Sequence, residues 1–335
     1  MRRIFIDETV KEVAQYYVDH LFERHTRRGF VKPKEGLEAF ETEIMTGRAN
    51  CPLWKHYANY VKELREHLDE ILLLRPAQFN LWYHRYFDRI RKEMLTDRNW
   101  RNRRGDMNFS EHIVKIMHYK TVRSEDMIPC VKKLGIKACV YCNAQYTNTI
   151  DIGDDGSVKG RYELDHFWPK DEYPFLCISF YNLQPCCGSC NKWKDDNKAR
   201  FNLYTDDYRS QEPFEFELTP KSMVKYMLRQ DSEVLDVKLK CNEPGLLDNH
   251  LQLFHTDDLY KTFNDELEEL VWKYKSFNQA FYEQLIERFT KLFPRHATRN
   301  DIIRFLYGFY AKAKDVHKKP LTKVKQDVAK QLGMI

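Results

Sequence analysis

Long apolar runs are missing from this sequence. The most apolar short run, Ile71 to Leu74, is far too brief to cross a bilayer, for which a helix needs about 20 residues. The opening segment MRRIFIDETVKEVAQ carries charges but no apolar stretch like that of a secretory signal. We therefore expect a cytoplasmic protein without a membrane association.

Glycine and proline are also scarce, with 12 of each in 335 residues. This scarcity excludes a collagen-like or low-complexity chain, and the sequence contains no internal repeat and no linker rich in these residues. Hydrophobic residues make up 42% of the chain, which is enough for a substantial core. The formal net charge of +5 is small, so it permits a nucleic-acid partner without requiring one.

Three regions differ in their hydrophobic pattern. Residues 1–130 and 205–335 carry apolar residues at helical spacing, whereas residues 131–204 break that pattern. The pattern predicts a mostly helical α+β fold. In it, a small mixed unit over residues 131–204 lies between, or packs against, helical N- and C-terminal regions, which form one domain or two.

Some helix boundaries are predicted from local signals. Ser110 is expected to be the N-cap of a short helix, and Thr298 the N-cap of another. Apolar residues from Leu267 to Leu292 predict one long helix that ends before Pro294. Pro320 is expected at the first position of a terminal helix.

The middle region, residues 131–204, contains the hydrophobic pattern of strands. Two alternating runs lie between Tyr146 and Phe167, on either side of the turn signal Gly153-Asp154-Asp155-Gly156, and predict a β-hairpin. A helix is expected to begin near Cys190, after the turn-like sequence CCGSC.

Two close cysteine pairs frame this region. Cys139 and Cys142 form one CxxC, and Cys187 and Cys190 form the second. In a reducing compartment such pairs predict metal ligands, and two pairs complete a closed four-sulfur site for structural Zn²⁺. The alternatives are a redox pair or merely buried thiols, but neither pair opens a helix in the βαβ context of a redox motif. Cys186, next to Cys187, leaves the choice of ligand open.

A closed four-cysteine site has no position for substrate, so chemistry must come from other residues. The segment ELDHFWP contains Asp165 and His166, and the later segment YNLQPCCGSCNKWKDDN contains Asn191. A neutral imidazole can take a proton from water near pH 7, while carboxylate and amide oxygens suit Mg²⁺ or Mn²⁺. Because neighbouring residues on a strand point to opposite faces, Asp165 and His166 can address one point only where the strand ends or bulges.

This ordered set of motifs resembles the HNH endonuclease family, which has a ββα-metal core. The resemblance covers Cys139 to Asn197, about a fifth of the chain. It implies that His166 is the general base and that Asp165 and Asn191 bind a catalytic Mg²⁺ or Mn²⁺. It also implies that Asn182 holds the loop and orients the histidine, and that Lys194 lies near the phosphate. Glu163 is expected to be a solvated strand residue.

Two further segments, CVYCNAQYT and DVHKKPLTKVKQD, are similar to HNH proteins of bacterial anti-phage systems. These include the Septu-type and retron-associated nucleases, which often work beside an ABC-type ATPase. The resemblance implies an antiviral role and an ATPase partner. Read from its residues alone, the second segment is a capped amphipathic helix.

The substrate is expected to be a nucleic acid. Basic residues outside the core fall into three clusters: Arg24, Arg27, Arg28, Lys32 and Lys34; Arg98, Arg101, Arg103 and Arg104; and Lys318, Lys319, Lys323 and Lys325. Such clusters can neutralise phosphates, and Trp100 could stack on a base, although ordinary solvated charges are the preferred interpretation.

The main hypothesis is an endonuclease that cleaves DNA with little intrinsic sequence specificity. An RNA-cleaving effector and a non-cutting, zinc-stabilised nucleic-acid-binding or adaptor module are the alternatives.

Overall fold

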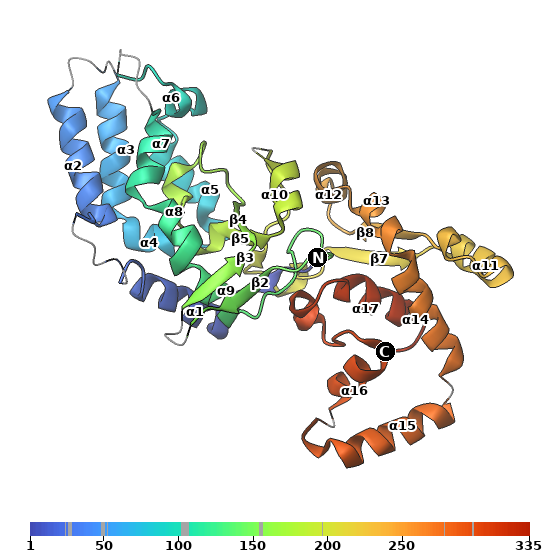
Figure 1. Cartoon of the computed structure of the whole chain (residues 1–335). Helices are drawn as coiled ribbons and strands as arrows, with labels where there is room; N and C mark the ends of the chain where they lie inside the picture. Colours follow the sequence, from blue (N-terminus) through green and yellow to red (C-terminus); the bar gives the residue numbers. More distant parts are fainter. Residues whose placement is uncertain are drawn as a thin grey trace.

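The computed structural model of the chain describes residues 1–23, 25, 29–47, 51, 53–101, 107–153, 157–195, 197–277, 279–296 and 298–335. Helices dominate, as expected, and the strands described form two-stranded sheets. Figure 1 shows helices from the N-terminal region at one end, short hairpins in the middle and helices from the C-terminal region at the other end. Among the described residues, no helix combines the length and the apolarity needed to span a membrane.

The N-terminal region is a helical layer in which α2 packs along α3. Its main elements are β1 (Ile4–Phe5), α1 (Glu8–Asp19), α2 (Pro33–Thr46), α3 (Trp54–Glu66), α4 (Leu68–Leu72), α5 (Phe79–Trp82), α6 (Lys92–Thr96), α7 (Phe109–Ile116), α8 (Tyr119–Thr121) and α9 (Ile128–Lys133).

The start of α7 corrects one prediction. Asn108, and not Ser110, is the N-cap: its side chain accepts a hydrogen bond from the backbone N–H of Glu111, which caps Asn108 in return. Such a reciprocal capping box stabilises a helix start by about 1 kcal/mol. Ser110 lies in the first turn, where its hydroxyl donates to the Lys170 carbonyl instead.

The middle region contains the predicted hairpin and a second one. Its elements are β2 (Asn148–Asp151), β3 (Val158–Arg161), β4 (Glu163–His166), β5 (Leu183–Cys186) and α10 (Gly188–Lys194). β2 pairs with β3, and β4 pairs with β5, both antiparallel. The pairing of β4 with β5 places Asp165 opposite Gln184 and His166 opposite Leu183. The helix α10 then packs back onto β4.

The C-terminal region is a set of helices around one further hairpin. Its main elements are β6 (Tyr204–Thr205), β7 (Phe214–Leu218), α11 (Pro220–Arg229), β8 (Val237–Cys241), α12 (Leu246–Phe254), α13 (Thr256–Tyr260), α14 (Asn264–Ser276), α15 (Gln279–Leu292), α16 (Arg299–Tyr307) and α17 (Thr322–Gln331).

Two helix predictions for this region were wrong, and one was right. The expected long helix is two helices, because α14 ends at Ser276 and Phe277 has an extended conformation; Asn278 lies outside the described residues. Pro320 precedes α17 instead of opening it, since Leu321 adopts a left-handed conformation with φ 59° as the N-cap. Thr298 caps α16 as predicted, accepting a hydrogen bond from the backbone N–H of Asp301.

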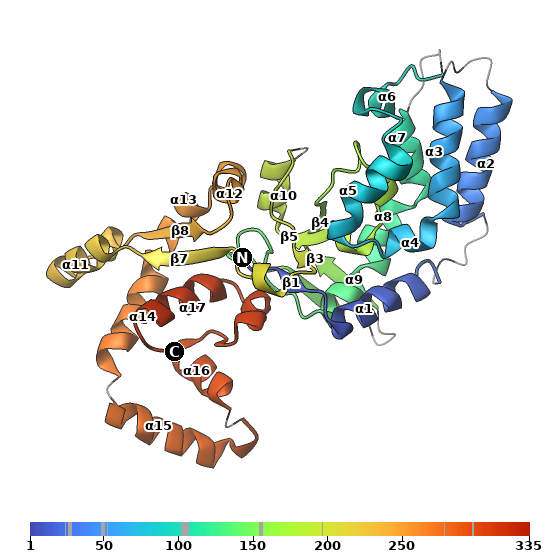
Figure 2. The ribbon, with the colours of Figure 1, turned by 180° about the vertical axis from the view of Figure 1, so that it is seen from behind.

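Segments distant in sequence meet around the middle region. β1 pairs in parallel with β6, so that Ile4 lies beside Tyr204; both views show β1 close to the central strands (Figures 1 and 2). The start of α17 binds Asn143, whose side-chain oxygen accepts from the backbone N–H of Lys323 at 2.9 Å. The N–H of Leu321 donates to the Asn143 carbonyl at 2.6 Å.

The buried His250 on α12 makes the stability of this fold sensitive to acid. Its ring packs between Phe214 and Phe254, with centroid distances of 4.6 and 4.9 Å, and burial lowers the pKa of His250 to about 3. In the unfolded chain the same ring titrates near pH 6.5, so the unfolded state takes up a proton first as the pH falls. This contribution to stability is complete above pH 6.5 and is lost as the pH falls towards 3.

We therefore expect wild type to lose about 2 kcal/mol of unfolding free energy through this one residue between pH 7.5 and pH 5. His250→Phe should remove that share of the pH dependence, as measured by urea unfolding at both pH values. Equal pH dependence in wild type and variant would contradict this account.

Candidate functional site

Four cysteines form a compact buried cluster. The Sγ atoms of Cys139, Cys142, Cys187 and Cys190 all lie within 4.8 Å of one another. In a tetrahedral zinc site with Zn–S bonds of about 2.3 Å, sulfur atoms lie roughly 3.8 Å apart. A small inward movement of the side chains is therefore sufficient, and the donor set fits a structural Zn²⁺. Cys186 is not part of the cluster, which settles the ligand choice that the sequence left open.

Local backbone structure brings each pair of thiols together. After Cys139 the chain makes a tight turn in which the N–H of Asn143 donates to the Cys139 carbonyl at 2.8 Å, and Asn143 takes a left-handed φ of 54°. The N–H of Ala144 points at the Cys142 sulfur, 3.4 Å away. Cys187 is the N-cap residue of α10, so this pair lies at a helix start.

Without a cation, the four thiols of the cluster cannot all ionise together. Hydrogen bonds from the other three thiols, led by Cys139, hold the pKa of Cys187 below its usual range. Burial raises the pKa of Cys139 well above it. Four buried thiols at this separation need a cation to be stable as thiolates, and Zn²⁺ would supply that charge.

Protein purified without added zinc is expected to retain about one Zn²⁺ per chain. The double variant Cys187→Ser/Cys190→Ser should lose the metal and fold poorly, whereas Cys186→Ala, which changes a neighbouring buried thiol, should keep it. Metal content by mass spectrometry, together with thiol alkylation under native conditions, measures both effects. Free, fast-reacting cysteines in metal-free, folded wild type would disprove the zinc site.

Asp165 lies at the centre of a buried polar network. Its side chain accepts hydrogen bonds from the Tyr141 hydroxyl and from Nζ of Lys194, the latter at 3.0 Å. Opposite it on β5, Nε2 of Gln184 donates to the Tyr141 hydroxyl oxygen at 2.9 Å. Burial raises the pKa of Asp165, and the Lys194 charge opposes this shift.

His166 contacts different residues from those that contact Asp165. Its Nε2 lies 2.9 Å from the Cys177 carbonyl, and its ring packs on Tyr119 with a centroid distance of 4.6 Å. Since a carbonyl can only accept, Nε2 carries the hydrogen and Nδ1 keeps a lone pair. Burial lowers the pKa of His166 to about 3, so the ring is neutral at neutral pH. Among the described residues, none is a hydrogen-bond partner of Nδ1, so this nitrogen is able to accept a proton.

Asn182 fixes the loop that follows β4. Its Oδ1 accepts from the N–H of Trp168 at 2.7 Å, and its Nδ2 donates to the carbonyls of Trp168 and Leu176 at 3.1 and 3.0 Å. Its own carbonyl accepts from the N–H of Phe167 at 2.9 Å. Asn182 therefore ties the residues just after His166 to the segment just before Cys177, which holds the imidazole.

Asn191 and Lys194 are three residues apart on α10 and so lie on the same helix face. Lys194 is almost fully buried, with 1% of its side chain exposed, and its Nζ also donates to the His166 carbonyl at 3.1 Å. Asn191 is half-buried. The structure thus brings Lys194 onto Asp165 itself, where the sequence had placed it only near a phosphate.

Glu163 and Trp100 also had predicted roles. Glu163 is half-buried on β4 and forms a 2.6 Å ion pair with Arg123. Trp100 is buried against Phe40 and Tyr57, so it is not available to stack on a base.

The sequence did not predict three residues that contact Asp165 or His166 directly: Tyr141, Tyr119 and Cys177. Tyr141 had a usable signal, because it lies between the two cysteines of the first pair. Tyr119 and Cys177 had none.

The basic clusters found in the sequence are largely neutralised. Lys34 pairs with Asp69, Arg98 with Glu111, Arg101 with Glu43, Lys318 with Asp315, Lys323 with Asp327 and Lys325 with Glu266. Arg24, Arg27, Arg28, Arg103 and Arg104 lie outside the described residues. For the described members, the interpretation as ordinary structural charges therefore fits better than a phosphate-binding surface.

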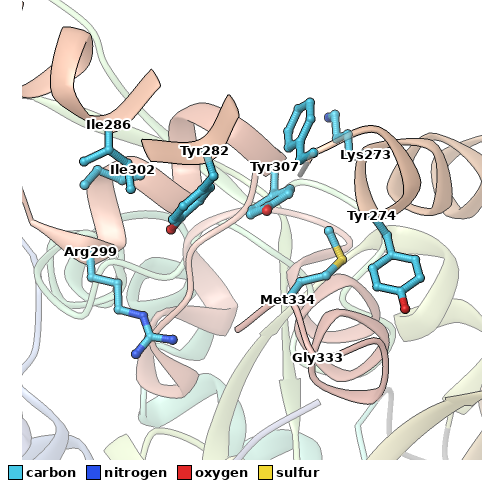
Figure 3. Close-up of a pocket in the computed structure, with 10 residues that line it drawn as sticks. Lys273, Tyr274, Tyr282, Ile286, Arg299, Ile302, Tyr307, Gly333 and Met334 are labelled. Atoms are coloured by element: carbon cyan, nitrogen blue, oxygen red, sulfur yellow. The ribbon is translucent and has the colours of Figure 1, made fainter. Parts of the chain in front are cut away.

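A cavity of about 550 Å³ lies between α14, α15, α16 and the residues after α17. Figure 3 shows rings of Tyr274, Tyr282 and Tyr307 and the guanidinium group of Arg299 around it. None of the predicted site residues lines this cavity.

The Lys194–Asp165 pair should be costly to break. Lys194→Met leaves an uncompensated carboxylate in the interior, and we expect a loss of about 3–5 kcal/mol in unfolding free energy. Replacing both partners, in Asp165→Asn/Lys194→Met, should recover much of this loss. Urea unfolding of zinc-loaded protein measures the difference, with Lys192→Met, an exposed position on the same helix, as the matched control. A loss below about 1 kcal/mol for Lys194→Met would show that the pair is solvated.

Part of the chain is similar in sequence to a known protein. The chain is similar to Septu protein PtuB of Bacillus thuringiensis, with 33% identity over 63 residues. This similarity covers 18% of the chain and about a fifth (21%) of that protein's length. No model of a known protein family matches the chain, and no solved structure matches it significantly.

Proposed function

We propose that the protein is a metal-dependent endonuclease of the HNH type that hydrolyses phosphodiester bonds of DNA. The observation that carries the proposal is the geometry of β4. Its last residue, His166, is held by Cys177 and Tyr119 with one ring nitrogen open, and its neighbour Asp165 lies under α10, the helix that begins at the four-cysteine cluster. This combination is what a positioned general base beside an acidic ligand requires.

The proposed reaction is hydrolysis by water. Nδ1 of His166 accepts a proton from the water as its oxygen forms a bond to phosphorus. The bond from phosphorus to the 3′ oxygen breaks, and that oxygen takes a proton from solvent, which leaves 5′-phosphate and 3′-hydroxyl ends. Nζ of Lys194 holds Asp165 and the His166 carbonyl, and Asn182 holds the loop that orients His166.

The residues present fit a catalytic Mg²⁺ or Mn²⁺. A carboxylate has about four acceptor sites, and Asp165 uses one for Tyr141 and one for Lys194, so lone pairs remain. Asn191, one helical turn before Lys194, would add an amide oxygen. These oxygens suit a small hard cation that keeps several waters. The chemistry supplied by such an ion is stabilisation of the charge on the phosphate and on the leaving oxygen.

We further propose that the enzyme acts as an effector in bacterial anti-phage defence and that an ABC-type ATPase is its partner. The partial similarity to Septu protein PtuB supports the defence role. The ATPase partner rests on the resemblance to anti-phage HNH proteins alone.

A second candidate function is a zinc-stabilised module that binds nucleic acid without cutting it. Two observations favour it: both oxygens of Asp165 already have partners, and only 6% of His166 is exposed. For cleavage, the substrate must reach this ring, and Lys194 must share Asp165 with a metal ion.

Plasmid cleavage with Mg²⁺ or Mn²⁺ tests the proposal, with single-stranded and structured RNA digested in parallel. Wild type should nick or linearise the plasmid, and EDTA should abolish this. His166→Ala should reduce the rate at least ~100-fold, because a general base contributes about 10²–10⁴. His56→Ala, an exposed histidine on α3, is the matched control and should cut normally.

Full activity in His166→Ala would refute the assigned base. Tight DNA binding without any cleavage, over a range of metals and with candidate ATPase partners added, would favour the non-cutting module. Preferential digestion of RNA would instead change the substrate from DNA to RNA.

A further inference from the structure

A cavity of about 700 Å³ adjoins the site, on the side where His166 packs against Tyr119. Its walls come from α7, from α8 and from the loop after β4. The residues that line it include Val114, Lys115, His118, Tyr119, Lys120 and Lys170.

An unusual backbone conformation lies in the wall of this cavity. His118, between α7 and α8, has a left-handed φ of 52°, which turns the chain sharply after the last turn of α7. Its Nε2 donates to the Val31 carbonyl at 2.8 Å, and its ring stacks on Phe30 at 4.4 Å. These contacts hold a conformation that a non-glycine residue rarely adopts. Lys115 before the turn and Lys120 after it line the same cavity.

The lining of the cavity contains three lysines and two carboxylates, Glu111 and Asp171, which leaves an excess of one positive charge. Lys115 and Lys120 are exposed, and no carboxylate of the described residues lies within ion-pair distance of either. Lys170 has only a long contact of 3.7 Å with Asp171. The other acid at the rim, Glu111, is shared with Arg98 at 3.6 Å. These lysines differ in this respect from the paired basic clusters.

One wall is apolar, and that wall leads to His166. The Tyr119 ring lines the cavity and packs on the His166 ring, and its hydroxyl donates to the Leu164 carbonyl at 2.8 Å, which fixes it to β4. Val114 extends the apolar surface. Only 8% of Tyr119 is exposed, so its ring contributes a small part of the lining beside Val114. An apolar surface with nearby cations suits single-stranded nucleic acid, where a base lies against the apolar groups and lysines follow the phosphates.

We propose that this cavity is a nucleotide subsite that receives an unpaired nucleotide next to the bond to be cleaved. The base lies against Val114 and the exposed part of Tyr119, and Lys115, Lys120 and Lys170 bind the flanking phosphates. The proposal rests on the proposed nuclease function and narrows its substrate to nucleic acid with an unpaired nucleotide, such as a flap, a loop or a single strand. A fully paired base enters such a cavity only after unstacking, which costs a few kcal/mol.

Binding is measured in the His166→Ala background, so that no substrate is consumed. Fluorescence anisotropy compares a labelled single-stranded DNA, a flapped duplex and a blunt duplex of the same sequence, at several salt concentrations. We expect the first two to bind more tightly than the blunt duplex. Lys115→Glu/Lys120→Glu should weaken their binding about tenfold or more and lower the salt dependence by about one to two phosphate contacts.

Two comparison variants make the test specific. Lys221→Glu/Lys225→Glu makes the same charge change at exposed positions on α11, at the opposite end of the molecule, and should weaken binding only slightly (Figure 1). Val114→Trp fills the cavity without changing its charge and should remove the preference for unpaired DNA. Thermal unfolding checks that each variant is folded.

Equal losses of DNA-binding affinity in Lys115→Glu/Lys120→Glu and in Lys221→Glu/Lys225→Glu would overturn the subsite. So would tightest binding to the blunt duplex, or a preference for unpaired DNA that survives Val114→Trp. If the variants behave as expected but wild type cleaves no substrate, the subsite stands and the nuclease proposal fails, so the two failures are distinguishable.

Discussion

The arrangement of the site depends on four thiols from two distant segments that meet in one cluster. Cys139 and Cys142 come before the hairpins, and Cys187 and Cys190 come from the start of α10. Once these sulfur atoms share a cation, the first turn of α10 cannot move relative to the turn at Asn143. The rest of α10 then lies across β4, and Lys194, at its far end, reaches Asp165. A structural metal site of this kind sets the position of residues that never touch the metal.

The polar groups around Asp165 are the second constraint, because an interior charge is stable only with its partners in place. Tyr141, Gln184 and Lys194 come from three different segments, yet their hydrogen bonds form one chain through Asp165. Such a network contributes little net stability compared with an apolar core, but it penalises every arrangement in which one member is missing. It therefore selects a single position for α10 over β4.

Local signals in the sequence were sufficient to predict the cysteine cluster, the hairpin of β2 and β3, and the cap at Thr298. These depend on residues close together in the chain, such as the CxxC spacing and the alternating runs of β2 and β3. Asp154, Asp155 and Gly156 of the predicted turn lie outside the described residues. Features that depend on packing were not readable. The ion pair of Lys194 with Asp165 requires α10 to lie on β4, and the break between α14 and α15 is marked by neither glycine nor proline. The assignments of His166, Asp165 and Asn191 as catalytic groups remain predictions.

The contact between Asn143 and the start of α17 has a consequence for how the chain is made. Asn143 belongs to the first cysteine turn, and its partners Leu321 and Lys323 are separated from it by most of the C-terminal region. Contacts at such long sequence separation form late, because the entropy of closing the intervening loop must be overcome first. A ribosome that has produced both cysteine pairs, β4 and α10 therefore carries a site that still lacks one of its supports, and the turn at Asn143 gains its full set of hydrogen bonds only when synthesis has passed residue 323.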